Sequence, residues 1–292
     1  MVLEAGIRFP NIGIEIQELG TGVTIFGFKI AFYGMIIALG MLSGYLVAEW
    51  QAKRTGQNKD IYLDFALYAI IAAVIGARIY YVIFAWDEYK DNLIEVFHTR
   101  GGGLAIYGGI IGGILCALVY SKIKKISLWL LLDTACVGLL TGQIIGRWGN
   151  FVNREAFGGY TDNLLAMQLR KTDVSPSNIT AELLNHIKVV NGVEYIQVHP
   201  TFLYESLWNL CILIILLIYT KHKKFNGELI LLYLVGYGIG RAWIESLRTD
   251  QLLLWGTQFA ISELLSIVLA IVASIIIIVK RISLNKQQYK TN

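Results

Sequence analysis

Charged and amide side chains gather in residues 146–159, directly after a long apolar run of the sequence. This stretch reads GRWGNFVNREAFGG and carries Arg147, Asn150, Asn153 and Glu155. An arginine can bind an anion bidentately, and glycines let a backbone approach a ligand closely. A solvated turn after a helix end would explain the glycines and asparagines, but not the arginine and glutamate beside them. The composition therefore predicts a functional site here.

A second group of charges lies within GRAWIESLRTD, residues 240–250. Arg241 and Glu245 are four residues apart and so share one helical face, which Arg248 extends by about one turn. Two interpretations stay open for the pair. It is either a structural salt bridge that locks two helices, or Glu245 orients Arg241 so that its guanidinium is free to bind a phosphate.

A third group begins at His199 in HPTFLYESLWN, residues 199–209. Pro200 is a favoured first residue of a helix, so His199 stands at a helix start. It is either a capping or surface residue there or a catalytic one. Glu205, about a turn and a half into the helix, is a candidate partner for an arginine.

The segment 101–121 is rich in glycine and holds Tyr107 about one turn into its helix. Small residues at this spacing indicate tight helix packing. A glycine-rich helix start with free N–H groups also suits an anionic headgroup, in which case Tyr107 lies on a cavity wall. Arg78 and Asp133, within other apolar segments, are interpreted as structural.

The elements that carry these groups are helices of a membrane protein. Hydrophobic residues make up 55% of the 292-residue chain and charged residues 16%, against roughly half and about a quarter in soluble proteins. A helix needs about twenty apolar residues to cross a bilayer. This criterion predicts an all-α polytopic fold with seven spans, as one domain over residues 1–292: 24–48, 61–85, 103–121, 127–147, 201–220, 228–247 and 258–280.

The basic residues predict the orientation of these spans. They cluster after the first, third, fifth and last spans, which places those ends in the cytoplasm by the positive-inside rule and the N-terminus outside. The first twenty residues do not resemble a cleaved signal, so we expect the first span to direct insertion. Residues 148–200 then form a small extracytoplasmic head, with a short helix near 180–190 and a hairpin-like turn at NGVEY.

Metal and cofactor chemistry is not expected. Cys116, Cys136 and Cys211 lie in apolar runs without CxxC spacing, and we expect all three to be buried. The histidines are scattered without the spacing or acidic companions of a metal cluster. The histidines are His98, His186, His199 and His222.

The chain resembles the bacterial phosphatidylglycerol–prolipoprotein diacylglyceryl transferases. The family signature Arg-x-Gly-Asn-Phe-x-Asn-x-Glu-x-x-Gly is matched within residues 147–158, and YGM at Tyr33, HPTFLYE at 199–205 and GRAWIESLRTD at 240–250 also agree. The resemblance covers nearly the whole chain. It implies transfer of the diacylglyceryl group of phosphatidylglycerol to the thiol of the lipobox cysteine in a preprolipoprotein signal peptide, in the bacterial cell membrane. A thioether forms, glycerol phosphate leaves, and no cofactor, metal or nucleic acid takes part.

Carried over residue by residue, the resemblance implies roles for the groups singled out above. Those expected to act in catalysis are Arg147, Arg241, Tyr107 and Glu155. Those expected to bind substrate are Arg147, Asn150, Asn153, Tyr33, Glu245, Gly158, His199 and Glu205. Some members carry a histidine where this chain has Tyr107. A free tyrosine is a weaker acid than a thiol, so Tyr107 needs an adjacent cation to act as the base, and the identity of the base stays open.

Three other classes of protein compete with this interpretation. An anion transporter or channel also uses intramembrane arginines, but the halves show no inverted repeat and the polar groups cluster toward the outer side. An intramembrane protease lacks support, because the chain has neither a GxSG serine nor a pair of membrane aspartates. A receptor that binds anionic lipid without turnover stays open on residue types alone.

Overall fold

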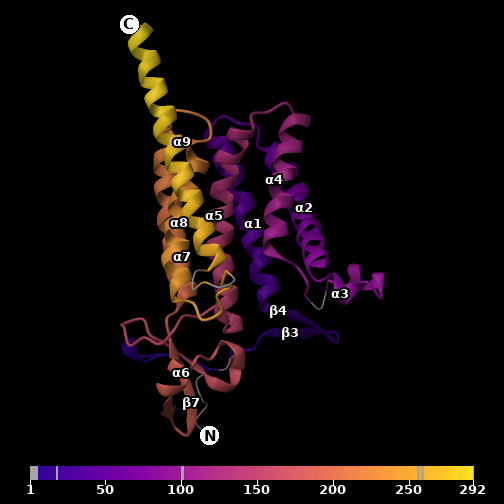
Figure 1. Cartoon of the computed structure of the whole chain (residues 1–292), viewed down its shortest axis with the longest axis vertical. Coiled ribbons are helices and arrows are strands. Elements are labelled where there is room, and N and C mark those ends of the chain that lie inside the picture. The colour runs from indigo at the N-terminus through magenta and orange to yellow at the C-terminus, as the bar shows by residue number, and fades with distance from the viewer. Residues whose placement is uncertain (1–5, 18, 100–101, 255–256, 258–259, 292) are drawn as a thin grey trace. The chain divides into compact units, whose positions relative to one another are not determined.

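The computed structural model describes residues 6–17, 19–99, 102–254, 257 and 260–291. The chain divides into two compact units (Figure 1). Unit 1 comprises Met1–Gly44 and Leu139–Asn292, and unit 2 comprises Tyr45–Gly138. The helices α1 (Phe32–Arg54) and α5 (Leu128–Asn153) run from one unit into the other. The prediction of one domain with residues 148–200 as an inserted head stays a prediction.

Six helices in the described part of the chain are long and apolar enough to cross a membrane. They are α1, α2 (Asp60–Phe84), α4 (Ile106–Ile123), α5, α7 (Thr201–Tyr219) and α9 (Ile261–Thr291). The seventh predicted span, 228–247, forms the helix α8 (Glu228–Leu247) but is not among the six. Its charged residues Glu228, Arg241 and Glu245 reduce its hydropathy. The protein is therefore mostly helical and a multi-pass membrane protein.

Four predicted bounds differ from the helices by six or more residues. α1 runs to Arg54 instead of 48, and α9 runs to Thr291 instead of 280. Residues 24–31 do not begin the first span, because the strands β3 (Gly22–Ile25) and β4 (Phe28–Ala31) form a hairpin whose turn has left-handed residues at Phe26 and Gly27. The fourth span does not end at 147, because α5 continues to Asn153. The polar stretch after Gly146 therefore starts as two further helical turns. Residues 258 and 259, at the predicted start of the last span, lie outside the described residues.

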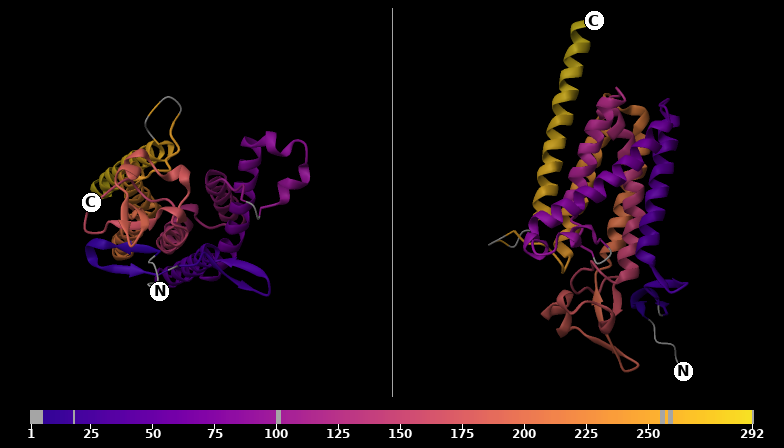
Figure 2. Two further views of the ribbon diagram at one scale, coloured as in Figure 1. Left: turned by 90° about the horizontal axis from the view of Figure 1, so that it is seen from below. Right: turned by 90° about the vertical axis from the view of Figure 1, so that its right-hand side faces the viewer.

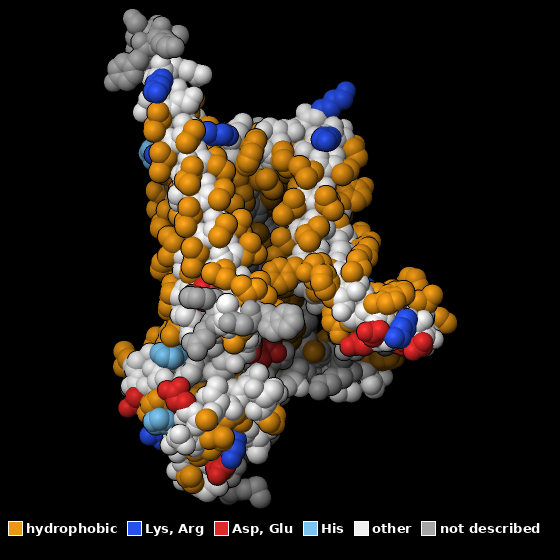
Figure 3. Space-filling view, in the orientation of Figure 1, with side chains coloured by type: hydrophobic (Ala, Val, Ile, Leu, Met, Phe, Trp, Pro, Cys, Tyr) orange, Lys and Arg blue, Asp and Glu red, His pale blue; other side chains and the backbone are white. Residues whose placement is uncertain are grey.

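The helices α7, α8 and α9 of unit 1 lie side by side (Figure 2). Their close approach depends on small residues. A Cβ on Gly238 of α8 would lie 2.6 Å from the carbonyl oxygen of Ser266 in α9, which is closer than real Cβ atoms come. Exposed apolar side chains such as Ile215 and Ile271 cover the outward faces of this group (Figure 3), as expected of helices that face lipid.

A five-stranded antiparallel sheet stands at one end of the unit 1 helices, in the order β2-β1-β5-β7-β6. The strands are β1 (Ile7–Phe9), β2 (Ile14–Ile16), β5 (Met167–Arg170), β6 (Lys188–Val190) and β7 (Val193–Val198). The predicted turn at NGVEY is confirmed: Asn191 and Gly192 both have positive φ and join β6 to β7. The predicted helix near 180–190 is only α6 (Ala181–Asn185).

The expectation of an all-α chain missed this sheet. Its strands are three to six residues long, and two of them come from the N-terminal residues that precede the first span. Phe151 at the end of α5, Phe157 and Phe202 of α7 are buried in the core under the sheet. The core therefore attaches the sheet to the polar end of α5.

Unit 2 is built on the packing of α2 against α4. A Cβ on Gly108 would lie 2.2 Å from the carbonyl oxygen of Gly76, so tight packing is confirmed as one role of the glycine-rich segment. Arg78 is buried, as a structural residue should be, and donates to the carbonyl oxygens of Glu95, Val96, His98 and Gly103 at 2.6 to 3.0 Å. The short helix α3 (Trp86–Tyr89) follows α2.

The cysteines do not all follow the expectation. Cys136 is buried, Cys116 is half-buried and Cys211 is exposed. Cys211 lies on the apolar helix α7, where a small thiol can face lipid at little cost, so the prediction of burial was wrong for it.

Candidate active site

The end of α5 carries a short chain of polar contacts. Arg147, Asn150 and Asn153 are spaced by three residues, so they follow the axis of one helix. Arg147 Nη1 donates to Asn150 Oδ1 at 3.3 Å, and Asn150 Nδ2 donates to Glu155 Oε1 at 2.9 Å. Arg154, just past the helix, has a φ of 54° and turns the chain back. Asn150 thus links the arginine to the glutamate.

Glu205 of α7 lies between two arginines. Its Oε1 is 2.5 Å from Arg147 Nη2 on α5, and its Oε2 is 3.3 Å from Arg241 Nη1 on α8. Glu205 is only 3% exposed, so the three helices meet around a buried carboxylate. This geometry fits Glu205 as partner for an arginine and joins segments that are nearly one hundred residues apart in the sequence.

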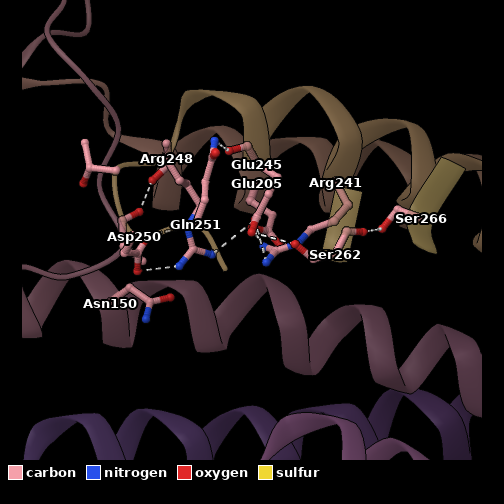
Figure 4. Close-up of polar contacts among 12 residues, drawn as sticks. Asn150, Glu205, Arg241, Glu245, Arg248, Asp250, Gln251, Ser262 and Ser266 are labelled. Carbon is pink, nitrogen blue, oxygen red and sulfur yellow. Dashed lines mark hydrogen bonds and ion pairs between the residues drawn. The ribbon is translucent and has the colours of Figure 1, made fainter. Parts of the chain in front are cut away.

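The contacts continue along α8 (Figure 4). Arg241 Nη2 is 2.7 Å from Glu245 Oε2, so the expected ion pair is present. Arg248 Nη1 lies 3.6 Å from the same carboxylate and also contacts Asp250. We call the six residues Arg147, Glu205, Arg241, Glu245, Arg248 and Asp250 the ion-pair row.

The ion-pair row is balanced in charge, with three arginines and three carboxylates. A buried carboxylate is tolerated when it is paired and hydrogen-bonded, and Glu245 also accepts from Ser262 Oγ of α9 at 2.6 Å. The sequence suggested that Glu245 leaves the guanidinium of Arg241 free. In the structure both terminal nitrogens of Arg241 contact carboxylates, so an incoming anion must compete with Glu205 or Glu245.

Gly158 lies where three distant segments meet. Its N–H donates to the His199 carbonyl oxygen at 3.0 Å, the Gly159 N–H donates to that of Leu247 at 2.9 Å, and the Thr249 N–H donates to that of Phe157 at 3.2 Å. A Cβ on Gly158 would lie 2.8 Å from both His199 Cβ and the Leu247 oxygen. We call this meeting point the glycine junction. It holds the residues before Arg248 against the stretch that follows α5.

Tyr33 lies in the second position of α1, against α5. A Cβ on Gly149 would be 2.8 Å from Tyr33 Cδ2, so glycine is needed for the ring to pack there. Tyr33 therefore packs against the residue that precedes Asn150 in the polar stretch of α5.

His199 does not cap α7 with its side chain. Its Nδ1 lies 3.4 Å from Tyr204 Oη, and Asn163 Nδ2 donates to the same oxygen at 2.9 Å. Burial lowers the pKa of His199 from its usual value of 6.5. The imidazole is therefore neutral at neutral pH, a form in which one ring nitrogen can accept a proton.

Two other predicted residues are not joined to these contacts by the described interactions. Asn153 is the half-buried last residue of α5. Tyr107 lies in unit 2, in the first turn of α4, where its ring centroid is 6.4 Å from that of Tyr80. Its role as a base stays a prediction.

Sequence reasoning missed Tyr237 and Ser262, whose side chains contact carboxylates of the ion-pair row, and Gln251, which donates to the Glu245 carbonyl oxygen. Tyr237 Oη lies 3.5 Å from Glu205 Oε1, and Tyr237 precedes Arg241 by four residues, so helical spacing could have indicated it. Ser262 contacts Glu245 across a loop that separates α8 from α9. Spacing within one helix carries no signal for a contact of that kind.

Arg147 and Arg241 form an anion site that the carboxylate of Glu205 occupies. One carboxylate bridges Arg147 and Arg241 with one oxygen each. Two non-bridging oxygens of a phosphate could bridge the same guanidiniums, and a developing negative charge between two fixed cations would be stabilised. The fold and this site together define a multi-pass membrane protein with a buried, charge-balanced site suited to an anionic ligand.

Comparison with known proteins agrees with a multi-pass membrane protein and identifies its family. Residues 21–279 match the family described as prolipoprotein diacylglyceryl transferase, and the chain belongs to this family. It is 44% identical over 253 residues to the phosphatidylglycerol–prolipoprotein diacylglyceryl transferase of Clostridioides difficile, covering 86% of this chain and 92% of the relative. The enzyme of the same name from Listeria monocytogenes serotype 4a is 42% identical over 279 residues, covering 95% of this chain and 96% of the relative.

Proposed function

We propose that this protein transfers the diacylglyceryl group of phosphatidylglycerol to the cysteine thiol of a preprolipoprotein, as the first step of lipoprotein maturation. The sulfur attacks the carbon of the diacylglyceryl group that bears the phosphate. A C–S bond forms there, and the bond from that carbon to the phosphate oxygen breaks. Glycerol phosphate leaves with the electron pair, and the thiol proton passes to a base. Membership of the family supports the reaction, and the bridged arginines Arg147 and Arg241 support how it is catalysed.

In this proposal the lipid phosphate replaces Glu205 as the anion between Arg147 and Arg241. Both guanidiniums then face the oxygens on which charge increases as the C–O bond breaks, which is the contribution usually largest in enzymes. Glu245 keeps its contact with Arg241 and fixes its orientation. Asn150 and Asn153 are proposed to bind headgroup hydroxyls, and Glu155 orients Asn150.

We further propose seven membrane spans, with the sheet outside the cell. Basic residues at the ends of α1, α4, α7 and α9 support this orientation. It places the ion-pair row near the outer surface, where an exported cysteine arrives. Single cysteines at Ser177 in the head and at Lys221 after α7, in a cysteine-free background, test it with an impermeant maleimide on intact cells. Labelling of the Lys221 site before lysis would contradict the orientation.

The decisive assay uses purified protein in detergent with phosphatidylglycerol labelled in its headgroup and a lipobox peptide. We expect release of labelled glycerol phosphate that depends on the peptide cysteine, and none with a Cys→Ser peptide. Arg147→Ala and Arg241→Ala should each abolish release, whereas Arg54→Ala, an exposed arginine of unit 2, should not. Activity retained in both site variants would exclude the role of the arginines, and lipid binding without release would favour a receptor.

A further inference from the structure

A wide-open surface cavity of about 420 Å³ lies beside the glycine junction, entirely within unit 1. The head loop that follows the junction forms one wall, and the ends of α7 and α8 form the others. Its lining residues are Asn163, Leu164, Leu165, His199, Tyr204, Trp243 and Leu247. The volume lies within the range of about 300–1,000 Å³ typical of ligand pockets.

The lining is apolar with one polar edge, and the described residues that form it include no Lys, Arg, Asp or Glu. Leu164 is 67% exposed and Trp243 is 40% exposed, so two large apolar surfaces face outward in the protein alone. Tyr204 Oη, with Asn163 and His199 around it, forms the polar edge. A charged headgroup has no counterion in this cavity, whereas an apolar chain with intermittent polar groups fits its walls.

The cavity adjoins the ion-pair row through the backbone. Leu247 lines the cavity and directly precedes Arg248, which contacts Glu245. His199 also lines it, and its carbonyl oxygen accepts from Gly158 in the glycine junction. The cavity therefore lies next to Arg248 of the row.

We propose that this cavity binds the apolar residues next to the acceptor cysteine of the preprolipoprotein signal peptide. The inference rests on the proposed function, which requires a peptide acceptor beside the phosphate. In a signal peptide, the positively charged start is followed by an apolar segment and then by small residues near the cleavage site. Their amide groups can hydrogen-bond to the polar edge at Tyr204, which a hydrocarbon acyl chain cannot do. Leu164 and Trp243 thus act as specificity residues for the peptide.

Two variants test the cavity without touching the ion-pair row. Leu164→Asp places a charge on an exposed cavity wall, and Trp243→Ala removes the largest apolar surface. Loss of one apolar contact in a binding pocket typically costs 10- to 200-fold in discrimination. We expect each variant to raise the KM for a lipobox peptide at least about tenfold and to leave the KM for phosphatidylglycerol unchanged.

Matched controls are available in the same chain. Leu184→Asp changes another exposed leucine of the head, in α6, and Trp50→Ala changes an exposed tryptophan of α1. Both should keep the wild-type KM for peptide. The unchanged KM for phosphatidylglycerol shows that the variants are folded.

Binding of a fluorescent Cys→Ser peptide to the protein, without turnover, provides a second measurement. The wild type should bind it more tightly than either cavity variant, whether or not glycerol phosphate is released, so failure of this inference is distinguishable from failure of the proposed function. Equal binding by wild type and variants would overturn the inference. A raised KM for phosphatidylglycerol with an unchanged KM for peptide would also overturn it and assign the cavity to an acyl chain.

Discussion

Replacing Glu205 with glutamine tests whether the ion-pair row is an anion site held closed by a carboxylate. Glu205 is 3% exposed and contacts Arg147 and Arg241 at 2.5 and 3.3 Å. At an effective dielectric constant of about 20, unit charges at these two separations attract by about 7 and about 5 kcal/mol, most of it offset by desolvation. Glutamine offers one acceptor oxygen, so one of the two guanidiniums would face an NH₂ group instead.

Removing one partner of a buried ion pair typically costs about 3–5 kcal/mol, and we expect Glu205→Gln to lower the free energy of unfolding by about that amount. The same change leaves the row with one excess positive charge. Phosphatidylglycerol carries one negative charge at its phosphate, so it should stabilise the variant more than the wild type, by linkage between binding and folding.

The assay is thermal unfolding in detergent, with added phosphatidylglycerol or the zwitterionic lipid phosphatidylcholine. Glu205→Asp keeps the charge and should recover part of the lost stability. Glu194→Gln is the control for an exposed pair with Lys171, where we expect about 0–1 kcal/mol. Glu205 does not hold an anion site closed if Glu205→Gln unfolds like the wild type, or if phosphatidylglycerol stabilises the variant no more than phosphatidylcholine does.

Three further predictions concern single residues. Gly158→Ala should lower the free energy of unfolding by about 1–3 kcal/mol and impair transfer, because its Cβ would lie 2.8 Å from a backbone oxygen and from a side-chain carbon. The control is Gly159→Ala, whose Cβ has its first contact at 3.6 Å. This control should unfold and turn over like the wild type. If Tyr107 is the base, Tyr107→Phe should lower kcat by about 100-fold or more; near-normal kcat across pH would assign the proton to another group. Burial lowers the pKa of His199 from 6.5, so the unfolded chain takes up the proton first as pH falls, and the stability contributed by neutral His199 is lost below about pH 6.5. The unfolding temperature should therefore fall more steeply as pH is lowered below about 6.5 in the wild type than in His199→Gln.

A helix could be predicted where its own segment contains an apolar run long enough to cross a membrane. α7 and α8 were located within a residue because an apolar run of about twenty residues has few alternatives. The same criterion misread residues 24–31, where an apolar hairpin has the mean composition of a span. It also ended α5 too early, since hydropathy falls at Arg147 while the helical spacing of Arg147, Asn150 and Asn153 continues.

Within the site, contacts between residues of one helix could be predicted, but contacts between helices could not. Arg241 and Glu245 are paired by spacing within α8, and that pair is present. The bridge from Glu205 to Arg147 joins two helices, and no pattern within either helix specifies it. The sheet was missed for a similar reason, because Ile7–Phe9 pairs with Met167–Arg170 far along the chain.

The glycine junction can form only late in the synthesis of the protein. Gly158, His199 and Leu247 meet through backbone hydrogen bonds, and the ribosome reaches Leu247 last. Before α8 is made, Glu205 has Arg147 from α5 available but not Arg241. The nascent chain therefore holds an incomplete row until α8 is made, and α8 supplies both Arg241 and the Leu247 carbonyl oxygen of the junction.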